Sequence, residues 1–174
     1  MKVVRSALLA LVTVAASAGV TRSVAAQTAV LTLSGGPVSF AAPTGSDYAA
    51  GWIYNPGYPG SGVTYTLDIT KGAANTTVTT TISVRAATAT LGGPAGVAKP
   101  IGDLQWARAD QMVWTPLTTA NMVVESRQMQ KNKLNDTWAN TLLWRVHVGW
   151  LTDPAGTYTT GPTGIVVTLS LTAP

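Results

Sequence analysis

Apolar and polar residues alternate along the stretch Thr141–Leu151, near the end of the chain. Five large apolar residues occupy every second position: Leu142, Trp144, Val146, Val148 and Trp150. This period places side chains on one face of a β-strand, so we expect a strand that is buried against a second layer. The last segment, Gly164–Thr172, has the same alternation, and Thr152–Gly156 between the two is rich in turn-forming residues. The two segments are predicted to form a closing β-hairpin.

The same two-residue period recurs along the chain. Strands are predicted at Gln27–Ser34, Val63–Ile69, Thr76–Ala86, Leu104–Arg108, Met112–Leu117 and Met122–Gln128. Glycine- and proline-rich turns separate them, which indicates an all-β fold with a single antiparallel β-sandwich of about eight or nine strands. Phe40 is assigned to the core. The polar, aperiodic stretch Gln130–Asn140 is expected to be an exposed excursion with at most one helical turn.

The N-terminus has the features of an export signal. A basic start, Met1–Arg5, precedes an apolar run, Ser6–Val20, that is short for a membrane-spanning helix. Small residues follow, so residues 1–26 are predicted to be a signal peptide cleaved before Gln27, and residues 27–174 a β-sandwich domain. Cleavage after Ala18 and an uncleaved anchor are the alternatives. The expected location is outside the cytoplasm, as a secreted, cell-surface or periplasmic protein, with no stable membrane insertion after cleavage.

Composition removes several function classes. The net charge of +4 falls to +1 when the signal is removed, because three of the eleven Lys and Arg residues leave and all seven Asp and Glu remain. Nucleic acid is therefore not predicted as a partner. The chain has no cysteine, which excludes disulfides, thiol catalysis and thiolate metal sites. The 148 residues left after removal of 26 from 174 are enough for a hydrophobic core.

No enzyme signature is present. The only histidine, His147, lies in mid-strand, and Ser61 lacks the glycine two residues before the serine that a nucleophile elbow requires. One histidine without cysteine makes a zinc site unexpected, and no alternating Asp/Asn loop indicates calcium. The scattered carboxylates are interpreted mainly as turn formers. No catalytic residue, metal site or cofactor is predicted.

Aromatic residues supply the candidate ligand site. Trp52, Tyr54 and Tyr58 lie in the Pro- and Gly-rich loop Gly45–Gly62, where their rings could stack on the faces of sugars. The alternative is that they cap the open end of the sandwich and keep water from the core. The alternation assigns four other tryptophans to the core: Trp106, Trp114, Trp144 and Trp150. Trp138 is either a core plug or an exposed contact.

Two segments carry a family resemblance. Asp153–Thr159 followed by an alternating last strand resembles the closing hairpin of bacterial immunoglobulin-like and pilus-subunit-like sandwiches. Leu104–Trp106 with Trp114–Leu117 is similar to hairpins of exported immunoglobulin-like modules. The segment Gly161–Gly164 interrupts the last strand. Either Tyr158–Thr160 is a separate short strand or the last strand carries a β-bulge, and we favour the bulge.

The resemblance implies a non-enzymatic structural or surface-interaction protein, such as a fimbria-like subunit. In such a protein Gln27–Ser34 would leave its own fold and complete the sheet of a neighbouring copy. The alternative is that this segment is simply the first strand of its own sandwich. A carbohydrate-binding module is the second function hypothesis, with glycans as partners, and a hydrolase is the third.

Overall fold

The computed structural model describes residues 28–35, 38–70, 77–94, 97–130, 136–159 and 165–172. The predicted signal peptide, residues 1–26, lies outside the described residues. The elements in chain order are β1 (Thr28–Ser34), β2 (Ser39–Phe40), α1 (Gly45–Ala50), β3 (Trp52–Tyr54), β4 (Val63–Thr70), β5 (Thr77–Ala86), β6 (Thr90–Gly92), β7 (Ala98–Pro100), η2 (Ile101–Asp103), β8 (Leu104–Arg108), β9 (Thr115–Pro116), β10 (Met122–Gln130), β11 (Asp136–His147), β12 (Tyr158–Thr159) and β13 (Ile165–Thr172).

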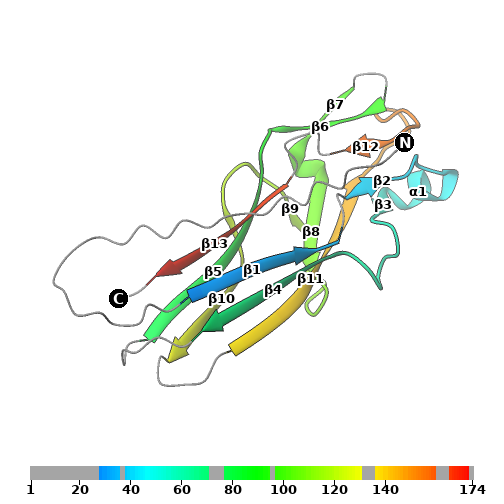
Figure 1. Ribbon diagram of the computed structural model, residues 1–174. Helices are drawn as coiled ribbons and strands as arrows, with labels where there is room; N and C mark the ends of the chain where they lie inside the picture. The colour runs from blue at the N-terminus through cyan, green and yellow to red at the C-terminus, as the bar shows by residue number, and fades with distance from the viewer. Residues whose placement is uncertain are drawn as a thin grey trace, which may run out of the picture.

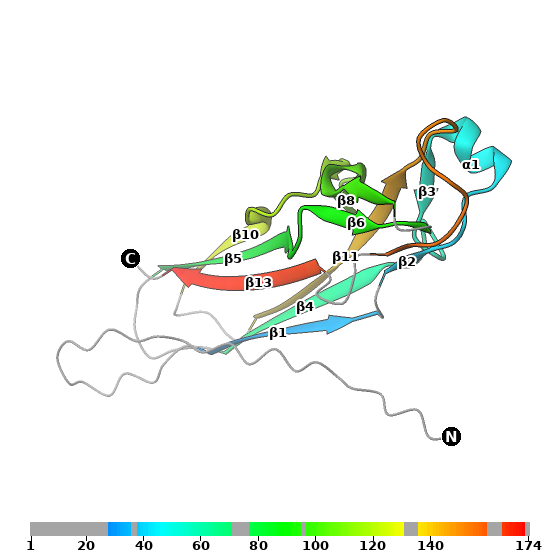
Figure 2. The ribbon, with the colours of Figure 1, turned by 90° about the horizontal axis from the view of Figure 1, so that it is seen from above.

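All strand pairs are antiparallel and form three sheets (Figures 1 and 2). The large sheet has the order β1-β4-β11-β8-β9, with β3 paired to β11. A three-stranded sheet has the order β10-β5-β13, and an end sheet has the order β2-β12-β6-β7. The all-β prediction is confirmed. The expected count of eight or nine strands is too low for the described residues, because six of their thirteen strands span only two or three residues and leave no period in the sequence.

The core lies between the large sheet and the three-stranded sheet. Strand β11 runs through the middle of the large sheet and contributes Leu142, Trp144 and Val146, all buried. Trp144 stands opposite Trp106 of β8, and both rings are buried as the alternation predicted. The facing sheet contributes Ile82 and Val84, and the end sheet adds Phe40, Leu91 and Tyr158. Burial of these side chains supplies the main stabilising term.

The predicted closing hairpin is wrong. Strand β11 pairs with β3, β4 and β8, whereas β13 pairs with β5 in the opposite sheet. Between them the chain passes through Tyr158–Thr159, which is a separate strand, β12, in the end sheet. The favoured β-bulge is therefore also wrong, and the alternative of a separate short strand is confirmed for Tyr158–Thr159. Alternation reports which face of a strand is buried, and two strands of different sheets can show the same alternation.

The predicted excursion Gln130–Asn140 is wrong at both of its ends. Strand β10 continues to Gln130 and β11 begins at Asp136; residues 131–135 lie outside the described residues. Trp138 is 7% exposed, so it is a core residue, and the guanidinium of Arg127 lies 4.6 Å from the centre of its ring. Thr137 donates a hydrogen bond to Asp68 across the strands (2.6 Å). Polar residues on the outer face of the strand concealed its period.

Trp150 is not in the core. It is 65% exposed and the adjacent Leu151 is fully exposed, because β11 ends at His147 and the chain turns at residues 150–152. The Trp150 ring stacks on Tyr48 of α1, with ring centroids 4.4 Å apart. The apolar alternation of the sequence therefore continues past the point where the chain leaves the sheet.

The described chain ends and the short helix lie at opposite ends of the molecule. Strand β1 begins, and β13 ends, at the same end, whereas α1 and β3 lie at the other (Figures 1 and 2). Helix α1 begins with a capping box, in which Thr44 and Asp47 each satisfy a backbone N–H of the other. No helix among the described residues is long and apolar enough to span a membrane.

Candidate functional site: an aromatic face around Arg145

Four aromatic side chains and one arginine gather on the outer surface of the large sheet. We call this set the aromatic face: Trp52, Tyr54, Tyr58, Trp114 and Arg145. In the pairing of β3 with β11, Tyr54 stands opposite Arg145 and Trp52 opposite His147. The intervening residues Ile53 and Val146 are buried in the core, so the side chains flanking them point outward.

The loop Asn55–Gly62 folds over the outside of the sheet and places Tyr58. Its first residue, Asn55, continues the pairing of β3, because its backbone N–H donates to the carbonyl of Trp144 (2.9 Å) and its Oδ1 accepts from the Trp144 N–H (2.8 Å). The Asn55 side chain also donates to the carbonyl of Ser61 (2.6 Å) and so closes the loop. The Tyr58 ring then stacks on Tyr54, with centroids 4.2 Å apart.

Arg145 is held between two tryptophans. Its guanidinium carbon lies 3.8 Å from the ring centre of Trp52 and 4.4 Å from that of Trp114. Cations stack favourably on indole faces, and the planar guanidinium does so with both of its faces. Nε and Nη2 both donate to Oε1 of Gln105 on β8, at 3.0 and 2.7 Å.

The prediction that Trp114 is a core residue is wrong. Thr115 stands opposite Trp106 and Pro116 opposite Gln105 in the pairing of β8 with β9. Trp114 therefore shares the outward direction of Pro116, and it is half-buried over Arg145. The alternation assigned both Trp106 and Trp114 to the core, but the register of β8 with β9 places Thr115, not Trp114, opposite the buried Trp106.

The three predicted ligand residues do come together, but not as a flat row of exposed rings. Trp52, Tyr54 and Tyr58 are all half-buried. Tyr54 and Tyr58 cover one face of each other, and Trp114 meets Tyr54 edge-on at a centroid distance of 5.8 Å. Trp52 and Tyr54 lie on the outer side of β3, at the end of the molecule where α1 also lies (Figure 1). Sequence reasoning missed Gln105, Trp114 and Arg145; the position of Arg145 on the polar face of its strand was the available signal.

One histidine borders the aromatic face. His147 is exposed and meets the Trp52 ring edge-on at 5.2 Å. Six of the seven carboxylates contact residues elsewhere in the described part of the chain: Asp47, Asp68, Asp103, Asp110, Glu125 and Asp153. Within the described ranges no three His, Asp or Glu side chains are close enough to hold a metal ion.

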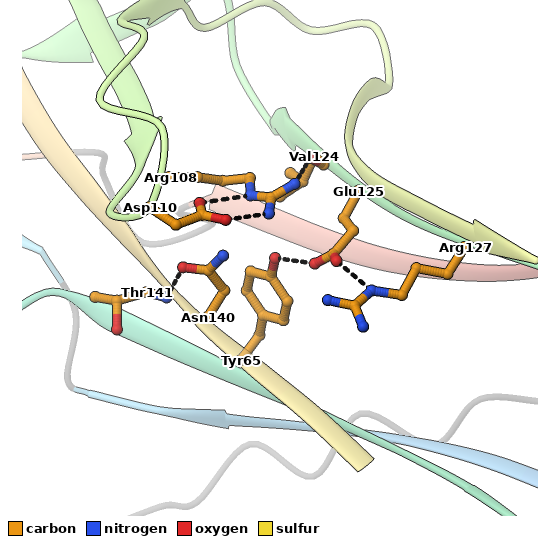
Figure 3. A network of polar contacts seen from close by, with 8 residues as sticks. All are labelled: Tyr65, Arg108, Asp110, Val124, Glu125, Arg127, Asn140 and Thr141. Atoms are coloured by element: carbon orange, nitrogen blue, oxygen red, sulfur yellow. Dashed lines mark hydrogen bonds and ion pairs between the residues drawn. The ribbon is translucent and has the colours of Figure 1, made fainter. Parts of the chain in front are cut away.

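Apart from the aromatic face, a cluster of polar side chains lies between the large sheet and the three-stranded sheet (Figure 3). The Tyr65 hydroxyl donates to Glu125 Oε2 at 2.5 Å, and Arg127 Nε donates to Oε1 of the same carboxylate at 2.5 Å. Burial, then the neighbouring Glu125, raises the pKa of the Tyr65 hydroxyl far above its ordinary value. The hydroxyl therefore keeps its proton and acts as a donor. This cluster is structural.

Arg108 forms a further ion pair in the same region. Its Nε donates to Asp110 Oδ1 at 3.0 Å, and hydrogen bonding to Arg108 holds the pKa of the Asp110 carboxyl below its usual range. The guanidinium of Arg108 also reaches the carbonyl of Val124 on β10 (3.5 Å). The cluster thereby ties β8 to the facing sheet.

Comparison with family models, curated proteins and solved structures finds no match to this chain. The described residues form an all-β protein of antiparallel sheets, with the aromatic face on the outer side of the large sheet. Its function is therefore inferred from the geometry.

Proposed function

We propose that this chain is an exported, non-enzymatic structural or surface-interaction protein with an immunoglobulin-like sandwich. In this proposal it assembles as a fimbria-like subunit, in which the N-terminal strand β1 of one copy pairs with β4 of the next. The observation that carries the proposal is the character of β1: it is an uncharged edge strand that contributes little to its own core.

Strand β1 stands at the edge of the large sheet and pairs only with β4 among the described strands. Of its side chains described at positions 30–34, Leu31 alone packs against the core. Val30 is 56% exposed and Leu33 44% exposed. Because most of what holds β1 is its backbone ladder, an identical strand from a second copy could replace it at little cost.

The three-stranded sheet also has an unpaired edge among the described strands, and this edge, that of β13, lies on the side of the molecule where β1 lies. The other main sheet ends in β10 and β13. Strand β10 lies over β4 and β8, because Glu125 contacts Tyr65 and Arg108 reaches the carbonyl of Val124. Strand β13 therefore lies on the side of β1. Both terminal strands thus present their outer edges on one side of the molecule.

The edge strand β10 differs from the edge strands β1 and β13, and the difference supports strand addition at β1 and β13. Strand β10 has two features that discourage pairing: Glu125 and Arg127 point inward at its edge, and its register shifts between Val123 and Glu125. Strands β1 (TAVLTLS) and β13 (IVVTLSLT) have no charged residue and no proline. Uncharged edges of this kind are templates for the addition of another strand.

The experiment is size-exclusion chromatography with electron microscopy of protein beginning at Gln27. The account predicts oligomers or fibres that grow with concentration. Leu31→Lys puts a charge on the face of β1 that meets the core, so this variant should remain monomeric. The matched control, Thr32→Lys, carries the same charge on the exposed face and should assemble. Monomers at high concentration from the unsubstituted protein would contradict the proposal.

Carbohydrate binding at the aromatic face is the second candidate function. The observation that favours it is the convergence of Trp52, Tyr54 and Tyr58 with Trp114 beside an arginine. Aromatic rings with polar edges are suited to sugars, whose C–H faces are apolar and whose rims carry hydroxyl groups. This function is compatible with assembly, because the aromatic face and β1 are separate surfaces.

A further inference from the structure

We propose that the aromatic face binds an acidic saccharide and that Arg145 holds the carboxylate of a uronic acid residue. The inference rests on the carbohydrate-binding candidate and names its ligand class; it does not depend on assembly through β1.

The charge of Arg145 has no carboxylate partner in the described structure. Lys99, Arg108 and Arg127 each form an ion pair with a carboxylate of the chain. All seven Asp and Glu residues lie within the described ranges, and no ion pair joins any of them to Arg145. The acceptor that Arg145 does have, Gln105, is neutral. Among the described residues, no carboxylate therefore offsets the positive charge of Arg145.

The orientation of the guanidinium leaves one edge for a ligand. The guanidinium carbon lies 3.8 Å from the ring centre of Trp52 and 4.4 Å from that of Trp114, and Gln105 takes the edge formed by Nε and Nη2. No described acceptor engages Nη1. A guanidinium can bind a carboxylate through two parallel hydrogen bonds at either of two edges, and with Nε and Nη2 on Gln105 the remaining one is formed by Nη1 and Nη2. The tryptophans and Gln105 fix this edge in place, so little side-chain entropy is lost on binding.

The composition of the face favours a sugar acid over other anions. Arg145 is the only Lys or Arg in the aromatic face, whereas proteins that bind nucleic acid place several cations along the phosphate chain. Tyr54, Tyr58 and Trp114 next to it provide ring surface for the C–H face of a sugar, and the two tyrosines also supply hydroxyl groups. A uronic acid residue has this combination of one carboxylate, one apolar face and several hydroxyl groups.

The test compares oligogalacturonate with the same oligomer after methyl esterification, which removes the charge and keeps the sugar. Binding to the intact mature protein is measured by titration calorimetry and tryptophan fluorescence at low salt. We expect the acidic oligomer to bind at least tenfold more tightly than its ester, with an affinity that falls as salt rises.

Two variants test whether Arg145 is responsible for binding the acidic oligomer. Arg145→Gln should weaken binding of the acidic oligomer at least tenfold. Gln105→Glu keeps the stack but gives Arg145 an internal carboxylate, so it should abolish the preference for acid while the fold, checked by circular dichroism and Tm, is retained. The control is Arg85→Gln, because Arg85 lies on β5 of the other sheet and should not affect binding.

Each outcome decides between the two levels of the proposal. Equal binding of acid and ester, or unchanged binding in the folded Gln105→Glu variant, would overturn acid recognition and leave sugar binding standing. Binding of neither oligomer at millimolar concentration would overturn both. Binding of acetate as tight as that of the oligomer would show simple anion capture and would also overturn the assignment of a saccharide.

Discussion

The Tyr65 hydroxyl on β4 donates a hydrogen bond of 2.5 Å to Glu125 Oε2 on β10. This bond joins the two main sheets through their interior, and both residues are buried. A buried carboxylate requires partners, which Tyr65 and Arg127 provide together. The pairing also explains how an acidic residue occupies the inner face of β10, where the sequence alternation would place an apolar one.

Removing this hydroxyl should destabilise the fold. Tyr65→Phe leaves one oxygen of Glu125 buried without its donor, which costs about 1–3 kcal/mol in the free energy of unfolding. Urea denaturation followed by tryptophan fluorescence measures the change. Tyr54→Phe is the matched control, since the Tyr54 side chain makes ring contacts but its hydroxyl has no hydrogen-bond partner among the described residues. A loss no greater in Tyr65→Phe than in the control would contradict the structural role of this bond.

Alkaline pH should weaken the fold through Tyr158. Burial, then the charge of Asp153, raises the pKa of Tyr158 to about 12, whereas an unfolded tyrosine has a pKa of about 10. The folded state binds the proton more tightly, so this stabilisation is present below pH ~10 and is lost as pH rises through the folded pKa. Tyr65 acts in the same direction. Unfolding free energies from pH 9 upward should decline less steeply in Tyr158→Phe; an unchanged slope would refute the assignment.

A buried ion pair anchors the turn that carries Trp150. Lys99 pairs with Asp153, and the second oxygen of Asp153 accepts from the Gly149 N–H (2.8 Å) and the Thr152 hydroxyl (3.0 Å). Lys99→Met would leave a buried carboxylate without its cation, at a cost of about 3–5 kcal/mol. The double variant Lys99→Met with Asp153→Leu should recover part of this loss in urea titrations. If the double variant is less stable than the single one, the pair is not the anchor.

Low pH should remove the stabilisation that the Lys99–Asp153 ion pair provides. Burial opposes ionisation of Asp153, but Lys99, the Gly149 amide and Thr152 outweigh it and hold the pKa of this carboxyl below its usual range. The stabilisation is therefore present above the unfolded pKa of about 3.9 and is lost as pH falls through the folded pKa. Acid unfolding of the double variant should show a smaller loss of stability below pH ~4 than the unsubstituted protein. Identical acid profiles would count against this linkage.

An exposed and a buried leucine should differ sharply in their contributions to the free energy of unfolding. Leu151 is fully exposed, whereas Leu143 on β11 is buried. We expect Leu151→Ala to change the unfolding free energy by less than about 0.5 kcal/mol and Leu143→Ala to lower it by about 2–5 kcal/mol. Thermal and urea unfolding of both variants provide the comparison. A large loss from Leu151→Ala would show that this tip packs against part of the protein.

Period-two alternation predicted the central strands and their buried faces well. It located β4, β8 and the inner face of β11, with Trp106 and Trp144 in the core. It failed where the backbone leaves the sheet, since Trp150 continues the alternation beyond the last paired residue. It also gave no information on which strands pair, so β11 and β13 were wrongly joined.

The candidate site was predicted in part. The aromatic loop was recognised from its composition, and its three rings do converge. Arg145 and Gln105 could not be assigned because their meeting depends on the pairing of β11 with β8. Helix α1, in contrast, left a readable signal: Thr44 followed three residues later by Asp47 is the spacing of a capping box.

Exchange of β1 between copies is tested most directly by an engineered disulfide. Thr32 stands opposite Thr66 in the pairing of β1 with β4, and the chain has no cysteine of its own. In the Thr32→Cys/Thr66→Cys variant, oxidised at high protein concentration, the account predicts disulfide-linked multimers on a non-reducing gel that collapse to monomer on reduction. A gel showing monomer alone, with mass spectrometry placing the disulfide within one chain, would contradict strand exchange.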